Sequence, residues 1–124
     1  MIRIAQKFIK SFSHALHGIA FLFKSQVNSR IELIITCIVV IAGILFKIST
    51  SEWLIILLCI ALVLSLEGIN TAIETFANKL HPDFDMEIGK VKDVAAGAVL
   101  IAAIVAAIIG FIIFVPRILD LFKN

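Results

Sequence analysis

Apolar residues follow two different patterns along this chain of 124 residues. Near the N-terminus they recur every three or four positions, while lysines, an arginine and histidines occupy another face. The apolar stripe consists of Ile4, Phe8, Phe12, Leu16, Ile19 and Phe23. This spacing predicts an amphipathic helix over about residues 4–26. Because its polar face is basic, we expect the helix to lie on a membrane surface.

Further along the chain, three apolar stretches are long enough to cross a bilayer, for which a helix needs about 17 to 25 residues. These stretches cover about residues 31–48, 53–76 and 94–115. Glu32 and Lys47 lie near the ends of the first stretch, where we expect them to reach toward the lipid headgroups. Residues 49–51 form a short polar connection and a helix cap, and Pro116 is expected to end the third stretch. The pattern predicts an all-α membrane protein in which a surface helix and three transmembrane helices form a single domain, residues 1–124.

Composition and charge support the membrane assignment and predict an orientation. Hydrophobic residues make up 61% of the chain, more than a soluble domain of this size can bury. Most lysines and arginines lie before the first span or in the polar segment 79–92 (Arg3, Lys7, Lys10, Lys24, Arg30, Lys79, Lys90 and Lys92). Basic residues favour the cytoplasmic side. We therefore expect a cytoplasmic N-terminus and an external C-terminus.

A polar stripe interrupts the second span. Glu67 and Glu74 are seven positions apart, so on a helix they lie within about 20° of each other and about 10 Å apart along the axis, with Asn70 near the same face. Acidic residues inside a membrane are costly and usually mark a pathway or a site. Three helices enclose little volume, so we expect another copy of the chain to cover the stripe, which predicts a homo-oligomer.

Other interpretations of these polar residues stay open on the residues alone. Glu67 and Glu74 could pair with basic residues of a neighbouring helix, and Asn70 could simply join two helices by hydrogen bonds. Lys92 and Asp93 precede the third span, where a lysine near free helix N–H groups suits a phosphate and an acid could cap the helix or assist a divalent ion. Lys92 could equally be a membrane anchor.

Familiar nucleotide-binding motifs are missing, because the glycines form neither a GxGxxG pattern nor a phosphate-binding loop with lysine. An acidic site inside the membrane beside a basic cytoplasmic segment is compatible with three classes of protein. They are an enzyme, a small oligomeric proton or cation transporter that uses Glu67, and a membrane scaffold without turnover.

Four stretches of the sequence carry a resemblance to a known family. They are KFIKSFSHALHGI at 7–19, NSRI at 28–31, EGINTAIE at 67–74 and KVKDVAAGAVL at 90–100. Together they resemble the small bacterial integral-membrane diacylglycerol kinase and undecaprenol kinase family, over nearly the whole chain. The polar positions of these stretches are specific to that family, whereas hydrophobic helices alone would not be.

The resemblance implies a homotrimer in the cytoplasmic membrane, with active sites shared between protomers and no nucleic-acid partner. It implies transfer of the terminal phosphate of ATP, with Mg²⁺, to the hydroxyl of a lipid alcohol, either undecaprenol or diacylglycerol. The roles it implies are a general base (Glu67), a polar neighbour of that base (Asn70), a metal ligand (Glu74), nucleotide-site residues (Lys92 and Asp93) and a phosphate contact (Lys10).

This chain departs from the family pattern at three polar positions. The family usually has glutamate and histidine in an E-x-N-x-x-I-H pattern, where this sequence has Gln26 and Glu32. It also often has aspartate where this chain has Asn78. Gln26 is therefore expected to be a neutral metal ligand beside Glu74, and metal binding to be weaker than in the family at large.

Overall fold

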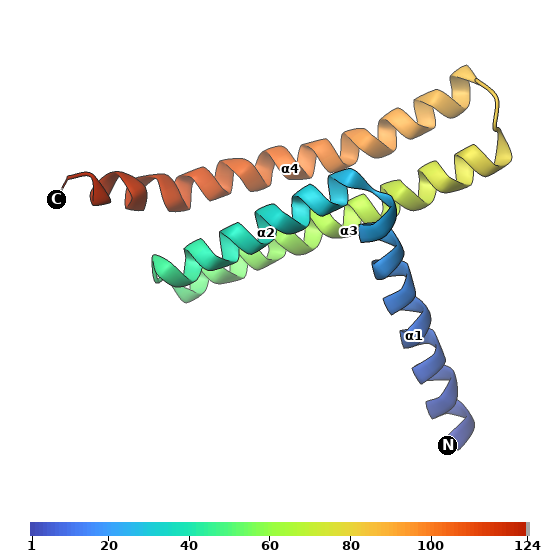
Figure 1. Ribbon diagram of the computed structural model, residues 1–124, viewed down its shortest axis with the longest axis horizontal. Helices are drawn as coiled ribbons and strands as arrows, with labels where there is room; N and C mark the ends of the chain where they lie inside the picture. Colours follow the sequence, from blue (N-terminus) through green and yellow to red (C-terminus); the bar gives the residue numbers. More distant parts are fainter. Residues whose placement is uncertain (124) are drawn as a thin grey trace.

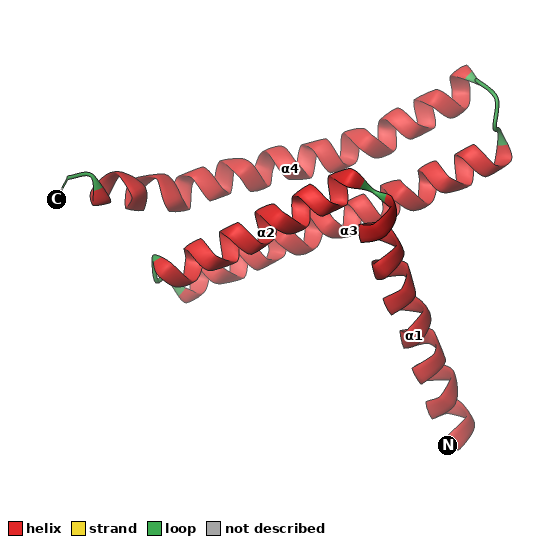
Figure 2. Ribbon diagram, viewed as in Figure 1, coloured by secondary structure: helices red, strands yellow, loops and turns green. Residues whose placement is uncertain are grey.

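The computed structural model describes residues 1–123, in which all regular structure is helical (Figure 2). Its four helices are α1 (Ile2–Ser25), α2 (Val27–Leu45), α3 (Thr50–Leu80) and α4 (Met86–Leu121). Three of them, α2, α3 and α4, are long and apolar enough to cross a membrane. The expected all-α class and the three spans are confirmed.

Helices α2, α3 and α4 run side by side in alternating directions, and α1 leaves them at a steep angle (Figure 1). The break between α1 and α2 is a single residue, Gln26, whose backbone is extended at φ −113° and ψ 126°. The apolar stripe of α1 remains uncovered, with Phe8 76% exposed and Phe12 62% exposed. An uncovered apolar face on a helix that crosses the direction of the spans suits a position at the membrane surface.

The first span begins and ends earlier than the apolar run suggested. We expected residues 31–48, whereas α2 covers Val27–Leu45 because the helix restarts directly after Gln26. It ends at a tight turn in which Lys47 has a positive φ of 49° and the Ile48 N–H donates to the Gly43 carbonyl. Hydropathy cannot locate such a turn, since Phe46 and Ile48 are as apolar as the helix before them.

The second and third spans extend well past their apolar cores on the side of the α3–α4 connection. The polar segment 79–92 is mostly helical, and the connection itself is only residues 81–85. Asp85 caps α4, since its Oδ1 accepts a hydrogen bond from the Ile88 N–H at 2.9 Å. That bond, assisted by nearby His81, holds the pKa of the Asp85 carboxyl below its usual range. Because the polar segment 79–92 is mostly helical, α3 and α4 project together beyond the start of α2 (Figure 1).

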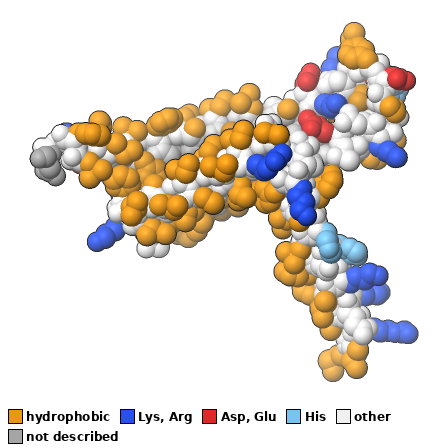
Figure 3. All heavy atoms as spheres, viewed as in Figure 1, with side chains coloured by type: hydrophobic (Ala, Val, Ile, Leu, Met, Phe, Trp, Pro, Cys, Tyr) orange, Lys and Arg blue, Asp and Glu red, His pale blue; other side chains and the backbone are white. Residues whose placement is uncertain are grey.

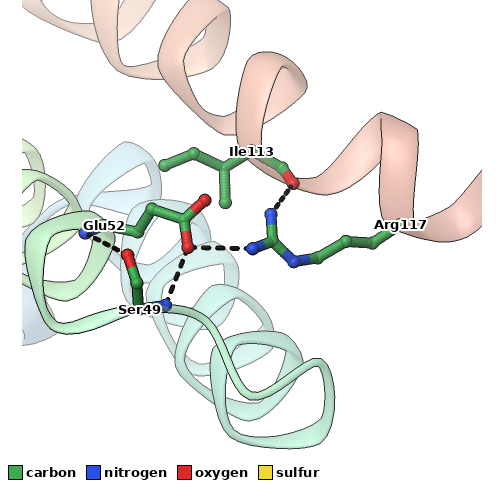
Figure 4. Close-up of polar contacts among 4 residues, drawn as sticks. All are labelled: Ser49, Glu52, Ile113 and Arg117. Atoms are coloured by element: carbon green, nitrogen blue, oxygen red, sulfur yellow. Dashed lines mark hydrogen bonds and ion pairs between the residues drawn. The ribbon is translucent and has the colours of Figure 1, made fainter.

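Pro116 does not end the third span as expected, because α4 continues to Leu121. A proline removes one helical hydrogen bond, and contacts to another helix can offset that loss. Here the Arg117 guanidinium donates to the Ile113 carbonyl at 2.6 Å and to Glu52 Oε2 at 2.9 Å (Figure 4). The turn after Pro116 is thereby held against the start of α3.

The start of α3 is capped as the sequence predicted. The Glu52 N–H donates to Ser49 Oγ at 3.2 Å, and the Ser49 N–H donates to Glu52 Oε2 at 2.7 Å. This reciprocal arrangement is a capping box. The Glu52 oxygen that completes it also accepts from Arg117 (Figure 4), so one carboxylate both caps α3 and ties it to α4.

Close packing at the same end joins α2 to α3. The buried core there consists of Ile48, Ile56, Ile113 and Phe114. Trp53 lies so close to Gly43 that a Cβ added at Gly43 would be 2.7 Å from Trp53 Cη2. Only a residue without a side chain allows α2 to approach α3 this closely.

Replacing Gly43 with alanine should therefore destabilise the protein, by about 1–3 kcal/mol as is usual for an overpacked core. The measurement is thermal unfolding in detergent. Gly110→Ala is the matched control, because a Cβ at Gly110 meets no atom within 4 Å. Equal unfolding midpoints for the two variants would contradict the close approach of α2 and α3.

Candidate active site

Glu67 lies in the middle of α3 and is almost completely buried, with 3% of its surface exposed. The group that covers it from α2 is Ser29, itself fully buried, whose hydroxyl donates a hydrogen bond to Glu67 Oε1 at 3.4 Å. We expected a second copy of the chain to cover this residue. That expectation is wrong for Glu67, because the elbow at Gln26 brings α2 of the same chain against it.

Two further polar residues of α3 are buried one turn beyond Glu67. Asn70 is 8% exposed and Thr71 is 4% exposed, and both follow Glu67 at the spacing that keeps them on one helical face. Asn70 Oδ1 and Thr71 Oγ1 have no hydrogen-bond partner within residues 1–123. Leaving such groups unpaired costs about 1–3 kcal/mol each, so they make this face of α3 a candidate binding site.

Glu32 adds a carboxylate from α2 to the same region, one turn beyond Ser29. We expected it to reach outward toward the lipid headgroups. Instead its Oε2 is buried and has no partner among the described residues. Glu32 also lines one side of an apolar cavity of about 440 Å³ between α2, α3 and α4. The prediction for Glu32 fails because α2 begins four residues earlier than its apolar core.

Glu74 lies two turns beyond Glu67 on α3 and is partly exposed. Neither Glu67 nor Glu74 forms an ion pair within the described part of the chain, where the four ion pairs join other residues. Pairing with basic residues of a neighbouring helix, which was an open interpretation of the stripe, therefore does not account for these two carboxylates in the chain itself.

Lys92 and Asp93 lie within α4, not at its beginning. The cap of α4 is Asp85, seven residues before Lys92, so the expected use of free helix N–H groups at Lys92 is wrong. The lysine contributes only its ammonium group, which donates to Asn78 Oδ1 at 3.0 Å across to α3. Asp93 is exposed. Because Asn78 is a neutral acceptor, this bond positions Lys92 without cancelling its charge.

Gln26 and Lys10 lie at different distances from this stripe. The antiparallel register set by Ser29 and Glu67 places Gln26 level with Asn70, about 6 Å short of Glu74 along the helix axis. Lys10 is twelve residues before Leu22, the residue at which α1 contacts α3 beside Gly68. Lys10 is therefore about 18 Å from that contact, measured along α1. One chain alone does not bring Lys10 to Glu67.

Charged side chains gather at one end of the molecule and along α1. Figure 3 shows acidic and basic groups over the projecting ends of α3 and α4, whereas the bodies of α2, α3 and α4 are covered by hydrophobic groups. Among residues 1–123 no three histidine, cysteine or acidic side chains converge in a way that could hold a metal ion. The site thus joins a buried carboxylate in the apolar region to a polar region that water can reach.

Comparison with known proteins gives this arrangement a family. The model of the family described as prokaryotic diacylglycerol kinase matches residues 13–114, which is most of the chain. The chain belongs to the prokaryotic diacylglycerol kinase family. It is a lipid kinase, and membership of this kinase family implies the use of ATP. Of the three classes left open by the residues, the enzyme is confirmed, and the resemblance carried by the four motif stretches is confirmed with it.

Relatives in the family bear two different names. The undecaprenol kinase of Bacillus subtilis is 39% identical over 111 residues, covering 90% of each chain. The diacylglycerol kinase of Synechocystis sp. is 34% identical over 120 residues, covering 96% of this chain and 69% of the relative. The diacylglycerol kinase of Haemophilus influenzae is 27% identical over 107 residues, covering 86% of this chain and 91% of the relative. The lipid alcohol is therefore not fixed by membership of the prokaryotic diacylglycerol kinase family.

Sequence reasoning missed or misplaced three residues of this candidate site. Thr71 could have been found, because it is four positions after Glu67 and so shares its face. Ser29 carried no such signal, since its contact with Glu67 depends on how α2 aligns with α3. Glu32 was noticed but placed at the membrane surface, because the start of α2 was predicted too late.

Proposed function

We propose that this lipid kinase phosphorylates undecaprenol or diacylglycerol at the cytoplasmic face of the membrane, with Glu67 as the general base. The observation that carries the proposal is a carboxylate buried on a membrane-spanning helix, followed one turn later on the same face by buried oxygens without partners within residues 1–123. A lipid hydroxyl can donate a hydrogen bond to such an oxygen while its hydrocarbon chain stays in the bilayer. A water-soluble phosphate acceptor would not require a base at this depth.

Glu67 has one oxygen engaged and one free for this reaction. Oε1 accepts from Ser29, whereas Oε2 accepts no hydrogen bond within residues 1–123 and is not among the fully enclosed unpaired atoms. Glu67 Oε2 takes the proton of the lipid hydroxyl while the oxygen of that hydroxyl forms a bond to the terminal phosphorus of ATP. The bond from that phosphorus to ADP breaks, and ADP leaves with the bonding electrons. Asn70 is proposed to orient the incoming hydroxyl by donating a hydrogen bond from its amide nitrogen to the hydroxyl oxygen, because the hydroxyl proton goes to Glu67.

The phosphate groups of ATP approach from the water side of the stripe. We assign the metal site to Glu74 and Gln26, and the nucleotide site to Lys92 and Asp93. Magnesium is usually held by one or two carboxylates together with the phosphates of the substrate. The single carboxylate of Glu74, without a convergent acidic cluster in residues 1–123, fits an ion that arrives with the nucleotide. Such an ion would offset the charge of the phosphates.

A homotrimer with shared sites accounts for Lys10. This residue is too far along α1 to reach the stripe of its own chain, and a phosphate contact from Lys10 therefore requires a neighbouring protomer. The family model begins at residue 13, so Lys10 lies just outside the matched range. The basic residues of α1 and of the projecting α3–α4 end favour the cytoplasmic side for both, with the C-terminus outside.

The direct test is phosphate transfer from labelled ATP to undecaprenol and to diacylglycerol, offered separately to purified protein in mixed micelles. Glu67→Gln keeps the shape of the side chain and removes the base, so turnover should fall by about 10²- to 10⁴-fold. Glu87→Gln is the control, because Glu87 is exposed in the first turn of α4 and, among residues 1–123, forms an ion pair only with Lys90. A correctly assembled Glu67→Gln protein with the turnover of the control would remove Glu67 from the role of base.

A magnesium titration tests the assignment of Gln26. Glutamate at this position would offer a charged oxygen, so Gln26→Glu should lower the Mg²⁺ concentration that gives half-maximal lipid phosphorylation. Glu74→Gln should raise that concentration sharply or abolish activity. The two changes should not be additive if both residues hold one ion. Gln6→Glu provides the matched control, because Gln6 is exposed on α1. If the Mg²⁺ titrations of Gln26→Glu, Gln6→Glu and the unmodified protein superimpose, residue 26 is not part of the metal site.

A further inference from the structure

Ser29 is an unusual residue for its place in the molecule. It is the only completely buried side chain among the described residues, and it lies in the first turn of α2, whose apolar neighbours face outward. Its hydroxyl makes a single hydrogen bond, to Glu67 Oε1, and joins residues 38 positions apart in the sequence. A buried hydroxyl without that bond would be unsatisfied, so Ser29 and Glu67 satisfy each other.

We propose that Ser29 is a positioning residue for Glu67, an inference that rests on Glu67 acting as the base. A glutamate side chain has three rotatable bonds, and only a contact at its end fixes the direction of its carboxylate. By donating to Oε1, Ser29 holds one oxygen against α2 and leaves Oε2 directed at the place where the lipid hydroxyl arrives. Without this bond Glu67 would spend part of its time in rotamers that cannot take the proton.

No other side chain in the described part of the chain performs this task. Ser29 is the only side chain there that donates a hydrogen bond to Glu67. The unpaired atom of Asn70 is its acceptor oxygen, and Glu32 presents a second carboxylate. Thr71 has a hydroxyl near the same face, but it makes no bond to Glu67. Orientation of the base therefore depends on one hydroxyl from a different helix.

The elbow between α1 and α2 determines whether Ser29 reaches Glu67. Gln26 breaks the helix three residues before Ser29, and Leu22 packs beside Gly68, the residue that follows Glu67. On one side of the extended residue Gln26, Leu22 of α1 contacts α3 beside Gly68. On the other side, Ser29 of α2 contacts Glu67. Ser29 owes its full burial to this elbow, which no local feature of its own sequence would provide.

The experiment compares Ser29→Ala with Ser29→Cys in the lipid phosphorylation assay, using whichever lipid alcohol the unmodified protein accepts. Loss of one positioning hydrogen bond should lower kcat by about 3- to 10-fold and leave KM for ATP unchanged. Cysteine has nearly the same size but is a weak donor, so its kcat should fall between those of serine and alanine. Ser65→Ala is the matched control, because Ser65 lies on α3 two residues before Glu67 but is exposed.

A double-mutant cycle separates positioning from a general loss of structure. Glu67→Asp shortens the acid and withdraws it from Ser29, so adding Ser29→Ala to Glu67→Asp should cause little further loss. Each variant is first checked for its unfolding midpoint in detergent. If Ser29→Ala does not assemble, the cycle is carried out with Ser29→Cys, which adds no cavity.

Three results would overturn the proposal for Ser29. They are a kcat of Ser29→Ala equal to that of Ser65→Ala, a loss confined to KM for ATP, and losses that add fully in the cycle. Failure of this inference is distinguishable from failure of the proposed function. An active Glu67→Gln protein would show that Glu67 is not the base. An inactive Glu67→Gln protein together with a fully active Ser29→Ala protein would contradict only the role of Ser29.

Discussion

The burial of one carboxylate in a membrane-spanning helix is the constraint on which the rest of this structure depends. An acid in the apolar region is costly unless protein covers it and a hydrogen bond receives it. The chain meets both needs with α2, which bends at Gln26 so that Ser29 reaches Glu67. Asn70 and Thr71, whose side-chain oxygens are unpaired within residues 1–123, lie one turn further along the same face of α3, where a bound substrate could meet them.

A lipid kinase has to join two substrates that prefer different surroundings, and α3 provides the connection. Its polar stripe runs from Glu67, enclosed between helices, to Glu74, which is partly exposed. Beyond this point α3 and α4 project together, held by the bond from Lys92 to Asn78. At the opposite end the capping box and Arg117 join the same two helices (Figure 4). The proposed reaction centre thus lies on a helix that is held to α4 at both ends.

Periodicity and hydropathy predicted the elements of the fold, because both depend on the residues of one helix at a time. The three spans and the shared face of Glu67 and Asn70 are of this kind. The cover of Glu67 was not predictable, since it depends on the register between α2 and α3. Pro116 was misread for a similar reason, because Arg117 stabilises the following turn through a residue of another helix. Contacts between helices, more than the properties of any one helix, decided where the sequence was misleading.

The central claim is that the site combines Glu67 of one protomer with Lys10 of another, and mixing two inactive proteins tests it most directly. Lys10→Met and Glu67→Gln are each purified, confirmed to be inactive, unfolded together and reassembled in equal amounts. If sites are shared between neighbours in a trimer, one of the three sites in each mixed trimer will contain both native residues. After random reassembly this amounts to about a quarter of all sites, and activity will return to that extent. If mixing restores no activity although mixed trimers are present, Lys10 and Glu67 of the same chain serve one site, and the account is contradicted.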